Sequence, residues 1–162
     1  MNPLSTCTCK KCGLGYAFAM GRRLLIVDDE PDMLDFLDRV FRREYEVLRA
    51  QSVEEALTLF KRGPFDVIVT DRRMPRRSGL ELLELAYQQQ PQAVRVLLTG
   101  YADSLVDEKV EQWKLVDAWV SKPIDSASLK EAIALAIQKR SAALAAAAVA
   151  PKPVKPGKPP VK

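Results

Sequence analysis

Short apolar segments alternate with amphipathic segments between Arg22 and Arg140, and this alternation limits the folds open to the chain. Such segments are apolar throughout and rich in β-branched residues, as in strands that are buried on both faces. Regular alternation with helical patterns is typical of a parallel sheet covered by helices on both sides. We therefore predict an α/β fold, a doubly wound five-stranded parallel sheet, with strands at residues 24–27, 45–50, 67–71, 94–98 and 118–120.

Five helices are expected to connect and follow these strands. Pro31 suits a first helical turn, and Ser52-Val53-Glu54-Glu55 is a capping box before the second helix. The helical pattern predicts helices from Pro31 to Phe41, from Ser52 to Phe60, from Ser78 to Gln89, at about residues 104–113, and from Asp125 or Ser126 onward. The Ala-rich run 142–150 is expected to extend the last of them.

The segments outside residues 21–140 differ in composition from that single predicted domain. Residues 1–20 are expected to be a disordered leader that holds all three cysteines, Cys7, Cys9 and Cys12. These cysteines lack the fourth ligand that a structural zinc site needs, so their role stays open. Residues 141–162 are expected to be the helix extension followed by a disordered Pro/Lys tail.

Charge and composition exclude several classes of function. Residues 21–140 contain all 21 acidic residues, whereas six of the 25 basic residues lie outside them, so the predicted domain is slightly acidic. It is therefore not expected to bind nucleic acid. The chain has no histidine, which excludes histidine-based acid–base catalysis. Neither a membrane span nor a secretion signal is recognisable, and a cytoplasmic protein is expected.

Polar residues close four of the predicted strands. Asp28 and Asp29 follow the first strand, Asp71 ends the third, Thr99 ends the fourth, and Lys122 follows the fifth. The carboxyl ends of parallel strands lie at one edge of the sheet, where α/β proteins bind ligands. Three carboxylates that are crowded together repel one another and need a cation. Oxygen ligands alone favour Mg²⁺.

Such a site has the parts needed to handle a phosphoryl group. An aspartate can accept phosphate covalently, and Mg²⁺ would offset the charge of Asp71 and of the phosphoryl oxygens. Lys122 could hold one oxygen as a point charge, and Thr99 could donate a hydrogen bond to another.

These residues resemble the motifs of response-regulator receiver domains of two-component signalling. The resemblance covers about Arg22 to Arg140. It rests on Val27-Asp28-Asp29-Glu30-Pro31, on Val69-Thr70-Asp71-Arg72-Arg73-Met74-Pro75 with Ser78-Gly79, on Leu97-Leu98-Thr99-Gly100, and on Ser121-Lys122-Pro123. It implies a flavodoxin-like sheet with the strand order 2-1-3-4-5.

The resemblance also implies a role for each site residue. Asp71 would be the phosphoacceptor, Thr99 and Lys122 would contact the phosphoryl group, and Trp119 would be the switch aromatic. The expected Mg²⁺ ligands are Asp28, Asp29, Asp71 and the main-chain carbonyl of Arg73. A cis peptide bond is implied between Lys122 and Pro123.

The implied activity is a phosphorylation-controlled switch and not that of a conventional enzyme. A sensor histidine kinase or phosphotransfer protein would deliver the phosphoryl group, and slow self-dephosphorylation would follow. The added charge would draw Thr99 inward and let Trp119 move, which changes the face offered to an unknown downstream protein. No output domain is recognisable, so a stand-alone receiver is expected. A homodimer through the Trp119 face stays open.

Two alternatives compete with the switch. A phosphohydrolase with an aspartate nucleophile would need an acid two residues after Asp71, where Arg73 stands. A binding module that is never phosphorylated is disfavoured because all the expected site residues are present. The arginines beside the acceptor, Arg72 and Arg73, depart from the family pattern. They could hold phosphate, steer an acidic partner, or form a solvated basic loop.

Overall fold

The computed structural model describes residues 21–100 and 112–149. Its sheet contains five parallel strands in the order β2-β1-β3-β4-β5, which confirms the predicted fold. The strands are β1 (Arg23–Val27), β2 (Glu46–Ala50), β3 (Val67–Asp71), β4 (Val94–Thr99) and β5 (Ala118–Ser121). β1 and β3 are direct neighbours, with Val27 opposite Thr70. The segments that follow these two strands therefore lie side by side.

Four α-helices lie within the described residues: α1 (Pro31–Phe41), α2 (Val53–Phe60), α3 (Gly79–Gln89) and α4 (Ser126–Val149). The helix expected at about residues 104–113 falls almost entirely on residues outside the described ranges. Between that gap and β5 the chain forms a short 3₁₀ turn, η2 (Gln112–Leu115).

Side-chain caps begin three of these helices, and Asp125 caps α4 by accepting a hydrogen bond from the Ser128 amide at 3.0 Å. The Ser52 hydroxyl accepts a hydrogen bond from the Glu55 amide at 3.2 Å at the start of α2. At the start of α3, Ser78 and Glu81 form a reciprocal capping box.

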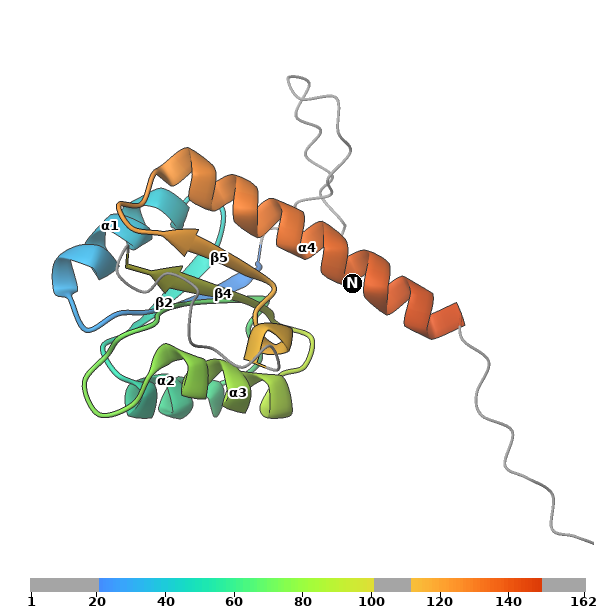
Figure 1. Cartoon of the computed structure of the whole chain (residues 1–162), viewed down its shortest axis with the longest axis horizontal. Helices are drawn as coiled ribbons and strands as arrows, with labels where there is room; N and C mark the ends of the chain where they lie inside the picture. Colours follow the sequence, from blue (N-terminus) through green and yellow to red (C-terminus); the bar gives the residue numbers. More distant parts are fainter. Residues whose placement is uncertain (1–20, 101–111, 150–162) are drawn as a thin grey trace, which may run out of the picture.

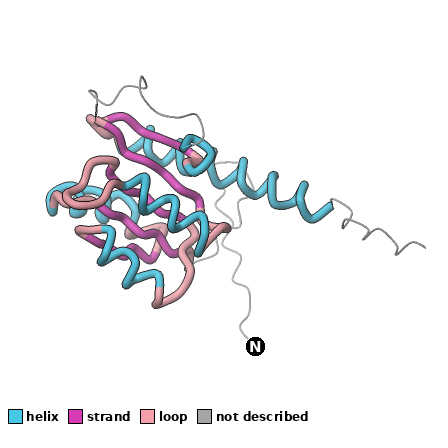
Figure 2. The backbone as a smooth tube through the Cα atoms, turned by 60° about the horizontal axis from the view of Figure 1, so that its bottom comes forward, coloured by secondary structure: helices cyan, strands magenta, loops and turns pink. Residues whose placement is uncertain are grey.

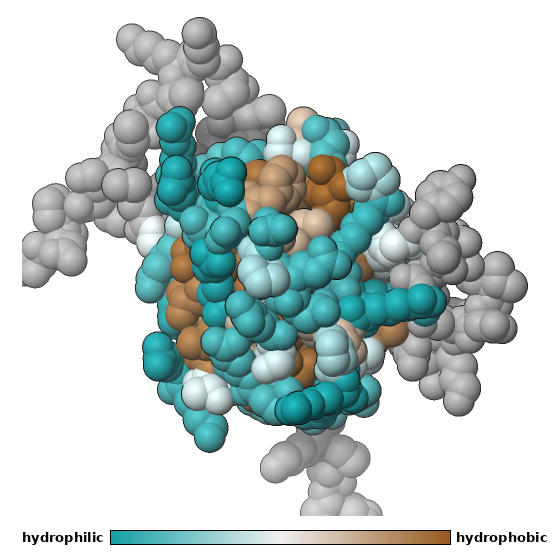
Figure 3. Space-filling model, turned by 90° about the vertical axis from the view of Figure 1, so that its left-hand side faces the viewer, coloured by the Kyte–Doolittle hydropathy of each residue, from teal (hydrophilic) through white to brown (hydrophobic). Residues whose placement is uncertain are grey.

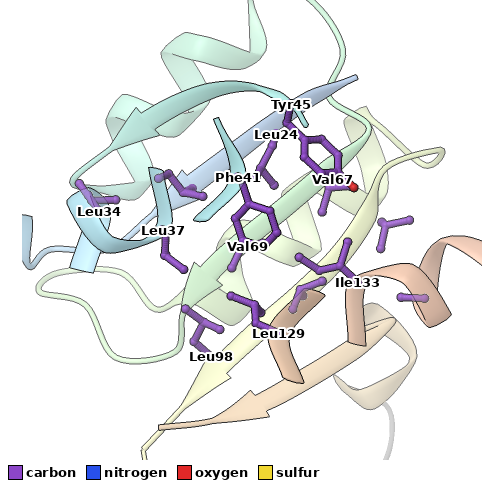
Figure 4. Close-up of a cluster of buried hydrophobic side chains, with 14 residues drawn as sticks. Leu24, Leu34, Leu37, Phe41, Tyr45, Val67, Val69, Leu98, Leu129 and Ile133 are labelled. Atoms are coloured by element: carbon purple, nitrogen blue, oxygen red, sulfur yellow. The ribbon is translucent and has the colours of Figure 1, made fainter. Parts of the chain in front are cut away.

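The helices cover both faces of the sheet, α1 and α4 on one side and α2 and α3 on the other (Figures 1 and 2). Successive residues of a strand point to opposite faces. In β1, Leu24 and Ile26 accordingly pack toward α1 and α4, whereas Leu25 and Val27 pack toward α2 and α3. Figure 4 shows the first of these two layers, where the rings of Phe41 and Tyr45 meet edge to face with their centroids 5.8 Å apart. Burial of both layers fixes the direction in which each strand ends.

The carboxyl ends of the strands point to the left in Figure 1. We call this edge of the sheet the rim and the opposite edge the amino edge. Seen from the rim side, the surface is mostly hydrophilic (Figure 3). Among the helices in the described ranges, none has both the length and the apolar character that crossing a membrane requires.

Candidate functional site

Asp28 and Asp71 lie at the rim on neighbouring strands and are both buried. Asp28 is fully buried and Asp71 is 7% exposed. Each carboxylate accepts a backbone hydrogen bond from two residues further along the chain: the Glu30 amide donates to Asp28 Oδ1 at 2.9 Å, and the Arg73 amide donates to Asp71 Oδ2 at 3.1 Å. These bonds aim the remaining oxygen of each carboxylate at the same third residue.

Lys122 bridges the two carboxylates. Its Nζ lies 2.8 Å from Asp71 Oδ1 and 3.4 Å from Asp28 Oδ2. The Lys122 amide donates to the Thr99 carbonyl at 2.7 Å, which attaches the residue after β5 to the end of β4. The Lys122–Pro123 peptide bond is cis, as the resemblance implies. The three side chains therefore form one cluster in which two carboxylates share one ammonium group.

The pKa values in this cluster reflect burial and charge. Burial raises the pKa of Asp28 above its ordinary value, although the hydrogen bond from Glu30 and the charge of Lys122 oppose the shift. Burial alone would lower the pKa of Lys122, but its hydrogen bond to Asp71 and the charges of both carboxylates outweigh this and raise it. The ammonium group therefore stays charged at neutral pH.

Thr99 and Trp119 are the predicted site residues on β4 and β5. Thr99 is the last residue of β4 and is half-buried. Trp119 lies on β5, opposite Leu97 in the register, and is 54% exposed. Nothing in its position tests the predicted switch.

The oxygen atoms at the rim are of the chemical type that binds a hydrated magnesium ion. Buried carboxylates and a main-chain carbonyl are the hard oxygen ligands that Mg²⁺ accepts, and this ion keeps several of its waters. Asp29 lies apart as an exposed residue. Within residues 21–100 and 112–149, no three Asp, Glu, Cys or His side chains gather closely enough to hold a metal. In this conformation the protein groups thus supply only part of a coordination shell.

The loop between β3 and α3 closes tightly behind Asp71. The Gly79 amide donates to the Arg72 carbonyl at 3.0 Å. A Cβ atom at Gly79 would collide with the carbonyl oxygen of Asp71, so only glycine permits this approach. Arg76, in the middle of the loop, has a φ of +72°, a conformation that residues with a side chain rarely adopt.

A second buried cluster of charges lies at the amino edge, and the sequence did not predict it. This amino-edge cluster contains Arg95, Asp117 and Arg140. Asp117 Oδ2 accepts from the Arg95 amide at 2.8 Å and contacts Arg95 Nη2 at 3.2 Å. Its Oδ1 lies 2.9 Å from Arg140 Nη1. The cluster therefore joins β4, the start of β5 and α4.

Arg95 is 1% exposed, although it lies in an otherwise apolar strand. Its Nε donates to the Leu115 carbonyl at 2.7 Å, and its guanidinium stacks 5.0 Å from the centroid of the Tyr87 ring. A charged residue inside the run Val94-Arg95-Val96 was the available signal, because a buried arginine needs a carboxylate partner. Nothing in the chain order singles out Asp117 as that partner.

The family model of the response regulator receiver domain matches residues 24–134. Among curated proteins, the response regulator protein PilR of Pseudomonas aeruginosa is 34% identical over 122 residues. That match covers 74% of this chain and 27% of PilR. The chain thus spans about a quarter of the length of this relative.

Solved structures show the same fold. A CheY-like response regulator receiver domain protein from Methanospirillum hungatei superposes with a TM-score of 0.64 at 28% identity, covering 75% of this chain and 98% of that one. The response regulator TrrA of Thermotoga maritima, solved in complex with Mg²⁺ and BeF, gives a TM-score of 0.62 at 34% identity. It covers 71% of this chain and 98% of that one.

Proposed function

The chain belongs to the response regulator receiver domain family, and on that premise we propose that residues 21–140 form a switch controlled by phosphorylation of Asp71. Receiver domains of two-component systems are phosphoaccepting signalling domains and not conventional enzymes. The observation that carries the proposal is the cluster of Asp71, Asp28 and Lys122, in which an acceptor carboxylate lies 2.8 Å from a charged ammonium group.

The donor in this proposal is a phosphohistidine of a sensor kinase or phosphotransfer protein. Asp71 attacks phosphorus, the phosphorus–nitrogen bond breaks, and the histidine nitrogen keeps the electron pair and takes a proton. The Lys122 ammonium, together with the Thr99 hydroxyl, holds phosphoryl oxygens. Later attack by water breaks the phosphorus–oxygen bond, which regenerates Asp71 and releases phosphate.

Asp28, Asp29, Asp71 and the main-chain carbonyl of Arg73 would hold Mg²⁺ in this proposal. When bound, the ion would offset the negative charge that accumulates between the acceptor and the phosphoryl group. The relative TrrA was solved with Mg²⁺ and BeF, which supports a metal at the corresponding edge here. Asp29 would have to turn inward from its exposed position, whereas Asp28 and Asp71 already lie together, buried at the rim.

The readout in this proposal is a change at the Trp119 face. Phosphorylation draws the Thr99 hydroxyl toward the new charge, and Trp119 moves into the space that this opens. A downstream protein then binds the altered face, with a second copy of this chain as the alternative occupant. Arg73 stands where an aspartate-based phosphohydrolase would need an acid, and this argues against multiple turnover.

Incubation with acetyl phosphate and Mg²⁺ tests the proposal. The expected product is a single phosphoryl adduct per chain, seen by intact-protein mass spectrometry, that hydroxylamine removes. Asp71→Asn should abolish it, whereas Asp38→Asn, at the end of α1 away from the rim, should not. Labelling that survives in Asp71→Asn would refute the assignment of the acceptor. Release of many equivalents of phosphate would instead indicate a hydrolase.

A further inference from the structure

Two turns at the amino edge carry exposed positive charge. The turn after α1, residues 39–46, contains Arg39, Arg42 and Arg43, and the turn after α2, residues 61–66, contains Lys61 and Arg62. All five residues are exposed. We call these segments the two basic turns. They lie where α1 and α2 end, at the edge of the sheet opposite the rim.

The two basic turns meet at the start of β1. The Glu46 amide donates to the Arg22 carbonyl, and the Asp66 amide donates to the Arg23 carbonyl, each at 2.9 Å. Two adjacent residues thus hold both turns, although α1 and α2 lie on opposite faces of the sheet. Five cations from two separate segments are therefore gathered around the beginning of one strand.

The carboxylates of the basic turns already have other partners. Glu44 Oε1 lies 2.6 Å from Lys130 Nζ, and Glu46 Oε2 lies 3.8 Å from Arg23 Nε. Asp66 Oδ2 accepts from the Arg23 amide at 2.8 Å. Within residues 21–100 and 112–149, no carboxylate forms an ion pair with any of the five cations. Their charge is therefore available to an anion from outside.

Charge changes sign along α1. Residues 28–38 contain six acidic residues and no lysine or arginine, whereas residues 39–43 contain three arginines and no acid. The slightly acidic average over residues 21–140 therefore hides two regions of opposite sign. A basic residue at the end of a helix offsets the helix dipole, but that dipole amounts to only about half a negative charge. It cannot balance three arginines after α1 or two cations after α2.

The side chains of the basic turns suit phosphate groups better than a lipid surface or unpaired bases. Four of the five cations are arginines, which can hold a phosphate through two hydrogen bonds. None of the large exposed apolar side chains lies in either turn, so neither turn offers an apolar anchor for a bilayer. The aromatic residues Phe41, Tyr45 and Phe65 are buried there, whereas binding of single strands relies on exposed aromatic rings that stack on bases.

The basic turns also lack the side chains that read bases or ribose. Residues 39–46 and 61–66 contain no serine, threonine, asparagine or glutamine. Such side chains contact base edges in DNA and 2′-hydroxyl groups in RNA. The remaining match is a regular double-stranded backbone, contacted through its phosphates alone. DNA is the duplex whose binding needs no contact with a 2′-hydroxyl group.

The two ends of the sequence carry charge of the same sign. Residues 1–20 and 141–162 contain six lysines and no acidic residue: Lys10, Lys11, Lys152, Lys155, Lys158 and Lys162. The first of these segments joins the fold at β1, where the two basic turns meet. Both segments lie outside residues 24–134, which the family model matches.

We propose that the two basic turns bind the phosphate backbone of double-stranded DNA without reading its sequence. The lysines of residues 1–20 and 141–162 add to the attraction. This binding does not depend on the proposed function, because Asp71 lies at the opposite edge of the sheet. It leaves the rim and its site facing away from the DNA.

Fluorescence anisotropy of a labelled DNA duplex of about 20 base pairs, a length that spans about two helical turns, tests the proposal with the full chain. The dissociation constant should lie at about 1–100 μM near 0.15 M salt, as for other binding that ignores sequence. The logarithm of the association constant should fall with the logarithm of the salt concentration with a slope of about −3 to −5. A second duplex of unrelated sequence should bind equally well.

Matched variants assign the binding to the basic turns. Arg42→Gln with Arg43→Gln should weaken binding by about 10-fold or more at low salt and make the slope shallower by about 2. Arg42→Lys with Arg43→Lys keeps the charge and should keep most of the affinity. Arg76→Gln with Arg77→Gln removes the same charge from the loop at the rim and should leave the affinity unchanged.

Several results would overturn the proposal. One is the absence of binding by the wild type at about 50 mM salt, where such contacts are strong. Another is a lower melting temperature of Arg42→Gln with Arg43→Gln without loss of affinity, which would leave these residues with a role at the helix end alone. Equal losses in the rim variant and the turn variant would also overturn it.

Two further comparisons exclude other binding modes. Glutamine at all four lysines of residues 150–162 should weaken binding but leave the effect of the turn variant in place, and the loss of that effect would assign binding to these lysines alone. Tighter binding to phosphatidylglycerol vesicles or to an RNA duplex than to DNA would overturn the choice of partner. Asp71→Asn should bind DNA as the wild type does, so failure of the proposed phosphorylation is a separate result.

Discussion

Two buried clusters of charge lie at opposite edges of the same sheet, and they differ in which sign is in excess. At the rim, two carboxylates share one lysine. At the amino edge, two arginines share one carboxylate, with both Asp117 oxygens engaged. Lysine is a point charge that can change partners, whereas arginine holds a carboxylate through a fixed fork of donors. In the proposed function, Lys122 exchanges its carboxylate contacts when a cation or a phosphoryl group binds at the rim, whereas the two arginines of the amino-edge cluster keep their contacts with Asp117.

The closed arrangement of the amino-edge cluster leaves some buried guanidinium nitrogens without a hydrogen bond to a described residue. Arg95 Nη1 and Arg140 Nε are buried without a hydrogen-bond partner in the described part of the chain. Burial lowers the pKa of Arg95, although the charge of Asp117 opposes the shift. The group nonetheless stays charged. Removing the one carboxylate would leave one buried cation, Arg95, and one partly buried cation, Arg140, uncompensated.

The largest expected effect comes from that removal. Asp117→Ala should lower the free energy of unfolding by about 3–5 kcal/mol, measured by urea denaturation. Arg95→Met and Arg140→Met combined with Asp117→Leu should recover most of this loss, because an apolar set of side chains needs no charge partner. A loss below about 1 kcal/mol in Asp117→Ala would show that this cluster behaves like a surface ion pair, and the contrast with the rim would fail.

Magnesium should stabilise the fold through the rim alone. A ligand at about 100 times its dissociation constant adds about 2.7 kcal/mol to the stability of the state that binds it. Thermal unfolding with and without MgCl₂ should show this increase in the wild type and in Arg140→Met, and not in Asp71→Asn. An equal increase in all three proteins would place the ion elsewhere.

Asp28→Asn should change the free energy of unfolding less than Asp117→Ala does, and should raise it when a chelator is present. Burial raises the pKa of Asp28 above 3.8, so ionised Asp28 is less stable in the folded chain than in the unfolded one. Removing the charge should therefore stabilise the fold by about 1 kcal/mol at neutral pH.

The pH dependence of this gain provides its check. The gain should shrink as the pH falls through the folded pKa and vanish below 3.8, where Asp28 binds a proton in both states. Urea denaturation of both proteins across this range measures it. A gain in stability of Asp28→Asn that increases as the pH falls would contradict the upward shift of the Asp28 pKa. With saturating MgCl₂ the order should reverse, because the variant has lost a proposed ligand.

The smallest expected effect concerns the rim end of α4. The Asp125 carboxylate accepts from the Ser128 amide and hydroxyl, each at 3.0 Å, and these bonds lower its pKa. Because the folded pKa is depressed, this stabilisation is full above the ordinary value of 3.8 and is lost as the pH falls through the folded pKa. Asp125→Asn should lower the melting temperature slightly at neutral pH, with no difference in strong acid. A drop comparable to that of Asp117→Ala would contradict the ranking.

The sequence predicted the rim better than the amino edge for a physical reason. Parallel strands bring their carboxyl ends together whatever the details, so Asp28, Asp71 and Lys122 had to meet once the strands were recognised. The pairing of Arg95 with Asp117 depends on how η2 enters β5, and no local pattern encodes that. The side-chain direction of Asp29 and the exposure of Trp119 likewise depend on packing across loops.

Helix α4 has a mechanical consequence. It begins just after the Lys122–Pro123 bond, passes Arg140 and continues to Val149 as one uninterrupted helix of 24 residues, or about 36 Å at 1.5 Å per residue. A rigid rod of that length works as a lever, since a tilt of about 5° at its base moves its tip by about 3 Å. The ion pair between Asp117 and Arg140 fixes this rod to the sheet part-way along its length, at 2.9 Å.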